Sequence, residues 1–242
     1  MGDFDLWSAR QRLYWACAAS PLSAVRHAEF SGIFSLDDAL GAPSEFLLDL
    51  AEAIIHASRT INLHSLDDRG VPDLIHLWPG EHYRLLAAAV RHLQPKRVVE
   101  IGTFTGLSAL AMMTELPQDG TLTTFDIVPW REIEGSALRE SDFVGSRLTQ
   151  VIGDPAEPGV VQKFTPLLEN ADMFFIDGPK DGVFEAQLLG HLNRVGLKKG
   201  AVLIFDDVRL WNMLAIWRSV TQPKRDITSF GHWSGTGMVE WQ

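Results

Sequence analysis

The chain has 242 residues, 46% of them apolar, with a net charge of −10 at pH 7 and a sequence pI of about 5.2. This length is sufficient to bury one large core and predicts a single α/β domain with an extension. The acidic balance, without a dense run of Lys or Arg, argues against nucleic acids and anionic membranes as partners, because phosphate contacts need clustered cations.

Cysteine content and apolar runs bear on the compartment. Cys17 is the single cysteine, which excludes an internal disulfide and is typical of a reducing cytoplasm, so we expect a cytoplasmic protein. The longest apolar run near the start, Leu13 to Ala19, is far shorter than the ~20 residues of a membrane span. Two arginines precede that run, as in a signal peptide, but Asp3 and Asp5 oppose that interpretation. We therefore expect no membrane partner.

Residues 1–75 carry no motif and are predicted to be mainly helical. Asp5 is placed to cap a helix through Ala19, and Pro43 and Ser44 open a second helix with one apolar face. We expect this extension to cover one edge of the core. The alternative is a dimer contact or a lid over a ligand site. The remainder, residues 76–242, is predicted to form one domain.

A strand, a glycine turn and a helix follow in residues 97–108. After a segment from Trp78 to His82 and a predicted helix, Tyr83 to Leu93, the apolar run Val98 to Ile101 reads as a buried strand that stops at Gly102. A new helix is expected near Gly106. Glycines at these two points let a ligand approach the backbone, and the helix start offers free N–H groups. This arrangement predicts a nucleotide-like ligand.

Three details narrow the class of ligand. Phe104 stands where the dinucleotide fingerprint has its second glycine, and the Lys-Ser/Thr pair of a P-loop is missing. Glu100, at the strand end, would repel a pyrophosphate but suits a cation. S-adenosylmethionine carries a sulfonium and an ammonium and has no phosphate, so the site is predicted to bind that cofactor.

Asp126 ends the next predicted strand, Thr121 to Asp126, about twenty residues after the glycine turn. An acidic residue there is placed to accept hydrogen bonds from both ribose hydroxyls; the alternative is an Asp that only begins the following loop. A third strand, Leu148 to Ile152, ends at Gly153 and Asp154. Asp154 either contacts the ligand or caps the following helix.

The second half continues the alternation. Strands are predicted over 172–177 and 200–207, helices over 183–193 and 208–220, and two final strands over 225–231 and 236–241. The fourth strand is apolar from Met173 to Ile176, as expected for a central parallel strand that is buried on both faces. Five strand–helix repeats followed by two strands predict an α/β fold.

Carboxylates end several of these strands. Asp177 follows the fourth, Asp206 and Asp207 end the fifth, and Lys180 lies three residues after Asp177. Because ligands in open α/β sheets sit at the carboxyl ends of the strands, we expect these groups to converge. Carboxylate oxygens are the ligands that Mg²⁺ prefers, and a metal lowers the pKa of a bound hydroxyl. The alternative is that the carboxylates only cap helices or bind cofactor groups.

The run Glu100-Ile101-Gly102-Thr103-Phe104-Thr105-Gly106-Leu107-Ser108 resembles motif I of class I methyltransferases, especially the catechol and caffeoyl-CoA O-methyltransferase group and its bacterial relatives. The similarity runs from about Trp78 to the C-terminus. It implies an S-adenosylmethionine-dependent methyltransferase domain over 76–242, with a Rossmann-like, doubly wound, mostly parallel seven-stranded sheet and an antiparallel C-terminal hairpin.

The resemblance also implies roles for residues. In relatives the residues after the third strand border the adenine, and the segment before the first strand lines the methionine end of the cofactor. Metal ligands are expected at Asp177, Asp206 and Asp207, and a general base at Lys180, with Asp177 also catalytic. The predicted cofactor-binding residues are Glu100, Gly102, Thr103, Phe104, Gly106, Ser108, Asp126, Gly153, Asp154 and Asp177.

Two positions depart from the family pattern. Asp207 stands where the family has Asn, which adds negative charge and makes a metal more necessary. Pro179 replaces an aromatic gate residue of the catechol enzyme, which argues against planar catechol specificity. His232 and Trp233, between the last two strands, either pack at the surface or belong to a loop over the substrate.

The sequence thus predicts an S-adenosylmethionine-dependent O-methyltransferase that acts on a hydroxyl of a small molecule (a phenol, a sugar or a secondary metabolite) with a divalent ion such as Mg²⁺. Two alternatives stay open: a metal-independent small-molecule N-methyltransferase of the same fold, and a cofactor-binding protein with a non-catalytic site. Apolar helices in residues 1–60 predict a homodimer, as does the resemblance to a family whose members are commonly dimers.

Overall fold

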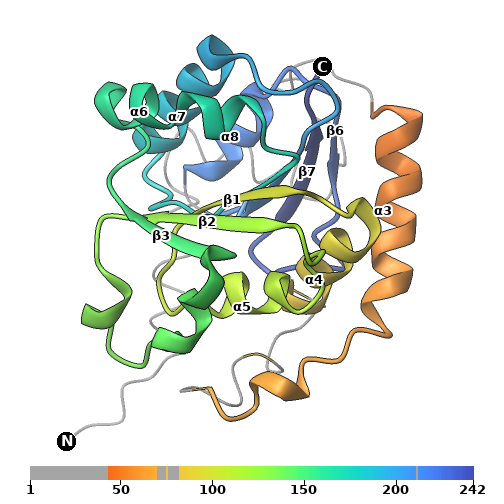
Figure 1. Ribbon diagram of the computed structural model, residues 1–242. Helices are drawn as coiled ribbons and strands as arrows, with labels where there is room; N and C mark the ends of the chain where they lie inside the picture. Colours follow the sequence, from red (N-terminus) through yellow and green to blue (C-terminus); the bar gives the residue numbers. More distant parts are fainter. Residues whose placement is uncertain (1–42, 70–74, 76–81, 211) are drawn as a thin grey trace, which may run out of the picture. The chain divides into compact units, whose positions relative to one another are not determined.

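A seven-stranded mixed sheet forms the centre of the computed structural model, which describes residues 43–69, 75, 82–210 and 212–242 (Figure 1). The strand order is β3-β2-β1-β4-β5-β7-β6; the pairs from β3 to β5 are parallel, and β7 runs antiparallel to β5 and β6. The predicted fold class is confirmed. The strands are β1 (Arg97–Ile101), β2 (Thr121–Asp126), β3 (Leu148–Ile152), β4 (Met173–Ile176), β5 (Val202–Asp206), β6 (Lys224–Asp226) and β7 (Thr236–Glu240).

Helices cover both faces of this sheet. One core contains apolar residues of α3, α4 and α5 packed on the first face, and the other contains those of α6, α7 and α8 on the second face (Figure 1). The helices are α3 (Glu45–Ser58), α4 (His82–Leu93), α5 (Leu107–Met113), α6 (Pro158–Glu169), α7 (Val183–Val195) and α8 (Met213–Ser219), with short 3-10 turns η1 (His64–Leu66), η3 (Trp130–Glu132) and η4 (Glu140–Ser146).

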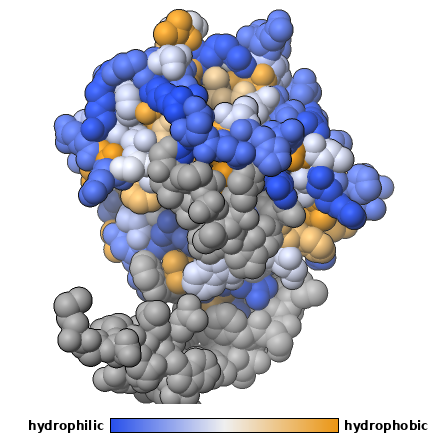
Figure 2. All heavy atoms as spheres, turned by 90° about the horizontal axis from the view of Figure 1, so that it is seen from below, coloured by the Kyte–Doolittle hydropathy of each residue, from blue (hydrophilic) through white to orange (hydrophobic). Residues whose placement is uncertain are grey.

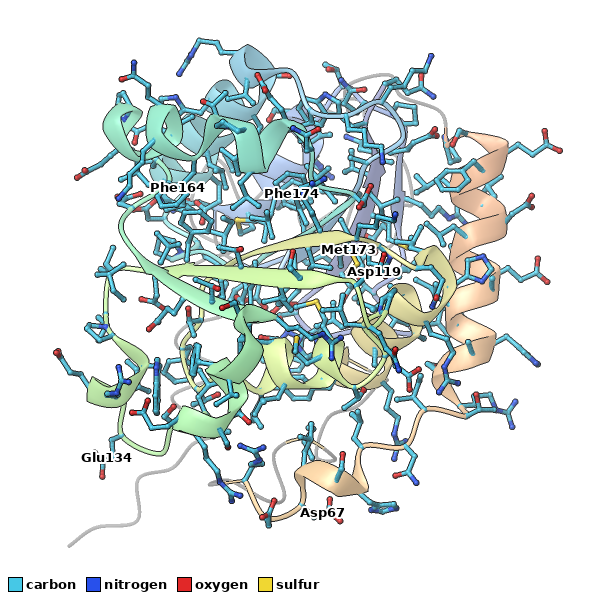
Figure 3. All side chains as sticks on the ribbon, viewed as in Figure 1. Asp67, Asp119, Glu134, Phe164, Met173 and Phe174 are labelled. Carbon is cyan, nitrogen blue, oxygen red and sulfur yellow. The ribbon has the colours of Figure 1, made fainter. Side chains whose placement is uncertain are left out.

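Strand β4 shows why the apolar runs are continuous. Met173 and Phe175 belong to the core under α4 and α5, whereas Phe174 and Ile176 belong to the core under α6 and α7 (Figure 3). Side chains alternate across a strand, and both faces of β4 are covered, so both alternating sets of its positions are apolar. The prediction for this strand is confirmed, with one residue fewer at each end.

Helix α3 lies in the predicted extension. It begins where Pro43 and Ser44 predicted it, and the Ser44 hydroxyl accepts from the Leu47 N–H at 3.1 Å as an N-cap. Ser44 also donates to the Glu240 carboxylate of β7, and α3 packs against α4, β6 and β7. The helix predicted from Asp5 lies outside the described residues. The division at residue 75 stays a prediction.

Helix α8 is shorter than predicted. It begins at Met213 rather than at residue 208. Residues 207–210 form a turn instead, in which the Leu210 N–H donates to the Asp207 carbonyl at 2.8 Å. The Arg209 N–H donates to the Ser234 carbonyl at 2.9 Å, which ties this turn to the loop before β7.

The described part of the chain contains no helix that is both long and apolar enough to cross a membrane. On the face shown in Figure 2, hydrophobic residues form small separate groups among hydrophilic ones. Single exposed apolar side chains of this kind are ordinary for a protein surface.

Candidate functional site

The carboxyl ends of β1, β2, β4 and β5 bring the predicted acidic residues to one edge of the sheet. Glu100 lies in β1, Asp126 ends β2, Asp177 follows β4 and Asp206 ends β5. These strands are parallel and in register, with β1 paired to both β2 and β4. The convergence follows from the topology, because parallel strands place all their carboxyl ends on the same side.

Gly102 allows the β1 turn to pass close to the neighbouring strand end. Its φ is +100°, and a Cβ atom there would lie 2.1 Å from the backbone oxygen of Asp177. Gly106, with φ +80°, precedes α5, and a Cβ there would meet the Leu138 side chain at 2.3 Å. Only glycine fits both positions, for conformation and for space.

Asp126 holds the turn in place. One carboxylate oxygen accepts from the backbone N–H groups of Thr103 (3.0 Å) and Phe104 (2.9 Å), and the other accepts from Val128 N–H (3.0 Å). A carboxylate has about four acceptor positions, so acceptor capacity for one further donor is left. Asp126 therefore orders the glycine turn in addition to facing the hollow described below.

Glu100 is fully buried rather than exposed at the strand end. It accepts a hydrogen bond from the Ser108 hydroxyl at 2.5 Å. Burial raises the pKa of its carboxyl to about 8, although hydrogen bonds from Ser108 and Thr124 oppose the shift. Glu100 thus fixes the first turn of α5 through its hydrogen bond with Ser108.

A hollow of about 300 Å³ opens beside the glycine turn. Six of the predicted cofactor-binding residues line it: Gly102, Phe104, Asp126, Gly153, Asp154 and Asp177. The other lining residues are Ile101, Phe125, Ile127, Pro155, Gly178, Pro179 and Phe184. The remaining four predicted residues, Glu100, Thr103, Gly106 and Ser108, are buried and do not line it.

Asp154 lines the hollow, as the first of its two predicted roles requires, and it does not cap α6, whose N-cap is Glu157. Its carboxylate also accepts from the Ala156 N–H at 2.7 Å, in the turn before α6. One oxygen is therefore engaged by the backbone, and acceptor capacity on the carboxylate is left for a ligand.

Asp177, Asp206 and Asp207 form a cluster next to this hollow. One carboxylate oxygen from each lies within 4.8 Å of the others, and Asp206 and Asp207 are only 4% and 6% exposed. Such a set of buried oxygens suits a hard divalent cation. Burial, together with the neighbouring charge of Asp206, raises the pKa of Asp177.

Lys180 supplies positive charge to the cluster. Its Nζ donates to Asp177 and lies 3.1 Å from an oxygen of Asp207. Burial alone would lower the pKa of Lys180, but the two carboxylates outweigh it and raise the pKa. Burial likewise opposes the shift at Asp207, where hydrogen bonds from His232 and Ser234 and the charge of Lys180 lower the pKa to about 2.

The loop that carries Lys180 is held by a residue that the sequence did not single out. Lys180 has a φ of +62°, and its N–H donates to one oxygen of Glu185 in α7 at 2.8 Å. The other oxygen of Glu185 accepts from Gly182 N–H at 2.9 Å. Glu185 is 1% exposed, so this buried carboxylate ties the loop to the helix.

Two histidines complete the cluster. His232 Nδ1 lies 3.0 Å from Asp206 and 3.2 Å from Asp207, and His82 Nδ1 lies 3.9 Å from Asp206. His232 therefore does not belong to an open surface loop. Burial lowers the pKa of His82, whereas at His232 the two carboxylates outweigh burial and raise the pKa to about 9.

The sequence offered no signal for His82 as a site residue. It begins α4, and 150 residues separate it from His232. Trp233 next to His232 is 58% exposed, and its ring makes an edge contact with His232 at 5.9 Å between centroids.

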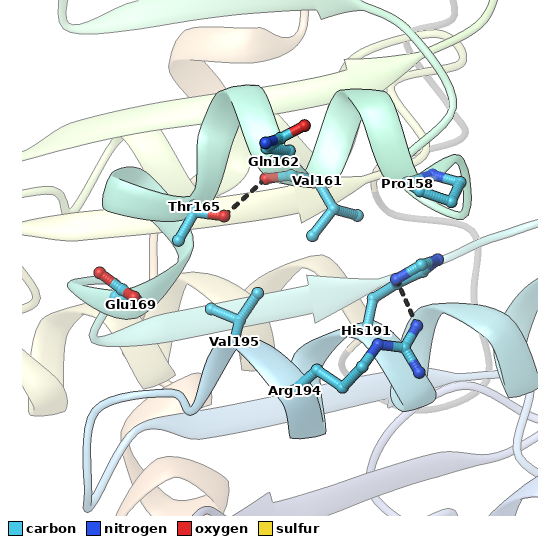
Figure 4. A pocket seen from close by; sticks show the side chains of 8 residues that line it. All are labelled: Pro158, Val161, Gln162, Thr165, Glu169, His191, Arg194 and Val195. Atoms are coloured by element: carbon cyan, nitrogen blue, oxygen red, sulfur yellow. Dashed lines mark hydrogen bonds between the residues drawn. The ribbon is translucent and has the colours of Figure 1, made fainter.

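A larger hollow, about 570 Å³, lies between α6 and α7 and contains none of the predicted site residues (Figure 4). His191 and Arg194 bond to each other on its wall, at 2.6 Å between Nδ1 and the guanidinium. His191 is also fixed by the Ala156 carbonyl at 2.8 Å.

Comparison with known proteins agrees with this geometry. A family model described as O-methyltransferase matches residues 78–226. A catechol O-methyltransferase of Mus musculus is 31% identical over 130 residues, which are 52% of this chain and 47% of that protein. A caffeoyl-CoA O-methyltransferase of Stellaria longipes is 34% identical over 71 residues, which are 29% of this chain and 30% of that protein. The matched part thus spans about half or less of these relatives.

The fold is also similar to that of a solved methyltransferase structure. The SAH-bound methyltransferase PaMTH1 of Podospora anserina has a TM-score of 0.50 to this chain at 17% identity, covering 100% of this chain and 98% of that one. At this identity the likeness concerns the fold. The family model covers well over half of the chain and includes every strand except β7, and the chain therefore belongs to the O-methyltransferase family, with the catechol and caffeoyl-CoA enzymes among its relatives.

Proposed function

We propose that the protein transfers a methyl group from S-adenosylmethionine to a hydroxyl of a small molecule, with the assistance of a divalent ion. The observation that carries this proposal is the position of Asp177, which lines the 300 Å³ hollow and also belongs to the three-carboxylate cluster. A cofactor in the hollow and an acceptor at the cluster would therefore be neighbours. Family membership supports the same reaction.

The hollow suits the cofactor by its charge. Asp126, Asp154 and Asp177 line it together with apolar residues, an environment that attracts a sulfonium and an ammonium and repels phosphates. We assign Asp126, which has acceptor capacity left for one further donor, to a ribose hydroxyl and Asp154 to the adenine end. The buried pair Glu100 and Ser108 would position the start of α5 at the methionine end.

The carboxylate cluster fits a divalent ion. Asp177, Asp206 and Asp207 supply oxygen donors that are close together, and Asp206 and Asp207 are buried. This is the donor chemistry of Mg²⁺. When bound, such an ion lowers the pKa of an acceptor hydroxyl. Asp207, where the family pattern has Asn, adds a negative charge to the cluster, and a bound cation would reduce the resulting repulsion.

Lys180 is the proposed general base. Its Nζ lies against Asp177 and Asp207, whose charges hold it protonated. When these carboxylates are neutralised by an ion, the pKa of Lys180 falls, and the amine can accept the proton of the acceptor hydroxyl. Lys180 thus moves a proton next to Asp177 and Asp207.

The two alternative functions differ from this one in the use of the cluster. A metal-independent N-methyltransferase would not need three clustered carboxylates, and a non-catalytic cofactor-binding protein would not need Lys180. We further propose a homodimer, a cytoplasmic location and an extension over residues 1–75. A monomeric mass in light scattering at micromolar protein would reject the dimer.

The proposal is tested by methyl transfer from labelled S-adenosylmethionine to a panel of phenols and sugars, with and without EDTA. We expect transfer to at least one hydroxyl acceptor and its loss in EDTA, with recovery on adding Mg²⁺. Transfer to amines alone, or full activity in excess EDTA, would favour the first alternative. Binding of S-adenosylhomocysteine without transfer to any acceptor would favour the second.

A further inference from the structure

The carboxylate cluster has a second side that contains nitrogen donors. His82 from α4, Asp206 from β5 and His232 from the loop before β7 each place one donor atom within 4.8 Å of the other two. His82 is 8% exposed, and the side chain of His232 is 13% exposed. The two imidazole rings lie 4.8 Å apart between centroids. Three segments far apart in the sequence therefore converge on one carboxylate.

The separations between Asp206 and each histidine are those of atoms that can share one ion. Two atoms that each lie about 2.1 Å from an ion are about 3 Å apart at a right angle and about 4.2 Å apart when opposite. The distances from Asp206 Oδ1 to His232 Nδ1 and to His82 Nδ1 are 3.0 Å and 3.9 Å. Both values fall within that span.

The lysine occupies the other side of the cluster. Lys180 Nζ bonds to Asp177 and Asp207, so an ammonium already balances those two carboxylates. Asp206 lies near both imidazoles. Asp207, by contrast, lies near Lys180 and near the imidazole of His232. Charge and donor type thus divide the cluster into an oxygen side near Lys180 and a mixed nitrogen–oxygen side at Asp206.

From this arrangement we propose that His82, Asp206 and His232 bind a divalent transition ion of the Zn²⁺ or Co²⁺ class. The inference rests on the proposed function, because this donor set shares Asp206 with the three-carboxylate cluster. Imidazole nitrogens favour Zn²⁺, Co²⁺ and similar ions, whereas Mg²⁺ favours oxygen donors and water. The histidines therefore select the ion. The carboxylates near Lys180, Asp177 and Asp207, lie where the acceptor hydroxyl is proposed to bind.

The test measures metal binding directly rather than activity. Chelator-stripped protein is titrated with Co²⁺, and the visible absorption of the bound ion is recorded up to one equivalent; Zn²⁺ and Mg²⁺ affinities are measured by calorimetry. We expect His82→Gln and His232→Asn to weaken Co²⁺ and Zn²⁺ binding by at least roughly 10–100-fold. The Mg²⁺ affinity should change by less than about threefold, because Mg²⁺ disfavours nitrogen ligands.

His92→Gln is the matched control. His92 is exposed at the other end of the same helix, α4, so its replacement should leave the Co²⁺ spectrum and affinity unchanged. Thermal unfolding and S-adenosylhomocysteine binding of each variant show whether it is folded. If either site variant does not fold, electron paramagnetic resonance of the wild type with one equivalent of Cu²⁺ decides, by the nitrogen hyperfine splitting of coordinated imidazole.

Unchanged Co²⁺ affinity in folded His82→Gln and His232→Asn protein, or a Cu²⁺ spectrum without nitrogen splitting, would overturn the inference. Those outcomes leave the proposed function intact if methyl transfer still depends on Mg²⁺. Conversely, histidine-dependent Co²⁺ binding in a protein that transfers no methyl group would uphold the ion site and reject the proposed function.

Discussion

Gly102 determines how closely two neighbouring strand ends approach each other at the site. We predict that Gly102→Ala abolishes S-adenosylhomocysteine binding and destabilises the fold by more than about 4 kcal/mol, because it combines a forbidden φ with a backbone clash. The clash would be with the Asp177 carbonyl, 2.1 Å from the new Cβ. Calorimetry and urea unfolding measure the two effects.

Gly145 provides the control for this substitution. It has a φ of +82°, but a Cβ added there would meet no atom within 4 Å. Gly145→Ala should therefore cost only the conformational strain, about 1–2 kcal/mol, and leave ligand binding unchanged. Equal losses in the two variants would show that close packing at Gly102 is unimportant.

Glu100 should make stability depend on pH. Its pKa is raised to about 8 in the folded chain from an ordinary value of 4.5, so the folded state binds more protons than the unfolded state between these values. The contribution of Glu100 to stability is then fully present below pH 4.5 and is lost as pH rises to about 8. The loss is on the order of several kcal/mol, since each pKa unit corresponds to about 1.4 kcal/mol.

Glu100→Gln removes this titration. Urea unfolding of ligand-free protein at pH 5 and pH 8 should show that the variant loses less stability across this interval than the wild type does. Glu134→Gln, at an exposed position, controls for the loss of one negative charge. If the free energy of unfolding changes equally with pH in the wild type and in Glu100→Gln, then Glu100 is not protonated in the folded state.

Lys180 is the residue on which turnover should depend most clearly. We expect Lys180→Ala to lower kcat by about 10²–10⁴-fold, the usual contribution of a general base, with S-adenosylhomocysteine affinity little changed. The base acts on the acceptor, and Lys180 does not line the hollow. Lys199→Ala, at an exposed position, is the control, and an unaltered kcat in Lys180→Ala would assign the lysine to structure.

At the scale of elements, the start of α7 positions that lysine. Glu185 accepts from the backbone N–H groups of Lys180 and Gly182. In Glu185→Ala both N–H groups lose their partner, at about 1–3 kcal/mol each when buried, and the loop is no longer fixed. We predict a fall in kcat with a smaller change in the KM for S-adenosylmethionine.

The comparison for this variant is Glu169→Ala, at the exposed end of α6. Glu185→Gln keeps one acceptor oxygen and should recover part of the activity. If Glu185→Ala lowers stability but leaves kcat at the wild-type value, then the loop does not need Glu185 to position Lys180.

Some of the helices and strands could be placed from the sequence and others could not. The convergence of Asp126, Asp177 and Asp206 was predictable, because parallel strands place their carboxyl ends at one edge of the sheet for any loop conformation. The start of α8 was not predictable, because the turn over residues 207–210 is tied to the distant loop before β7 through the Arg209 N–H and the Ser234 carbonyl. His82 was not predictable either, since its approach to Asp206 depends on how α4 packs on the sheet.

At the scale of the whole molecule, the net charge of the chain and the charge of the hollow have the same sign. The net charge is −10, and the hollow is lined by three aspartates with no Lys or Arg among its described lining residues. A charge pattern of this kind discriminates between ligands by sign before any contact is made. Cationic or zwitterionic ligands are favoured over pyrophosphates.

Ligand-dependent stability should report that discrimination. The ends of β1 to β4 all line the hollow, so a ligand there bridges four strands and binds only the folded state. S-adenosylhomocysteine at about 100 times its Kd should add about 2.7 kcal/mol, which raises Tm by roughly 5–10 °C for a chain of this size. NAD at the same concentration should leave Tm unchanged, because its pyrophosphate would face Asp126, Asp154 and Asp177, and Phe104 occupies the place of the fingerprint glycine. Differential scanning calorimetry with each ligand makes the comparison, and an equal rise with NAD would refute the charge argument.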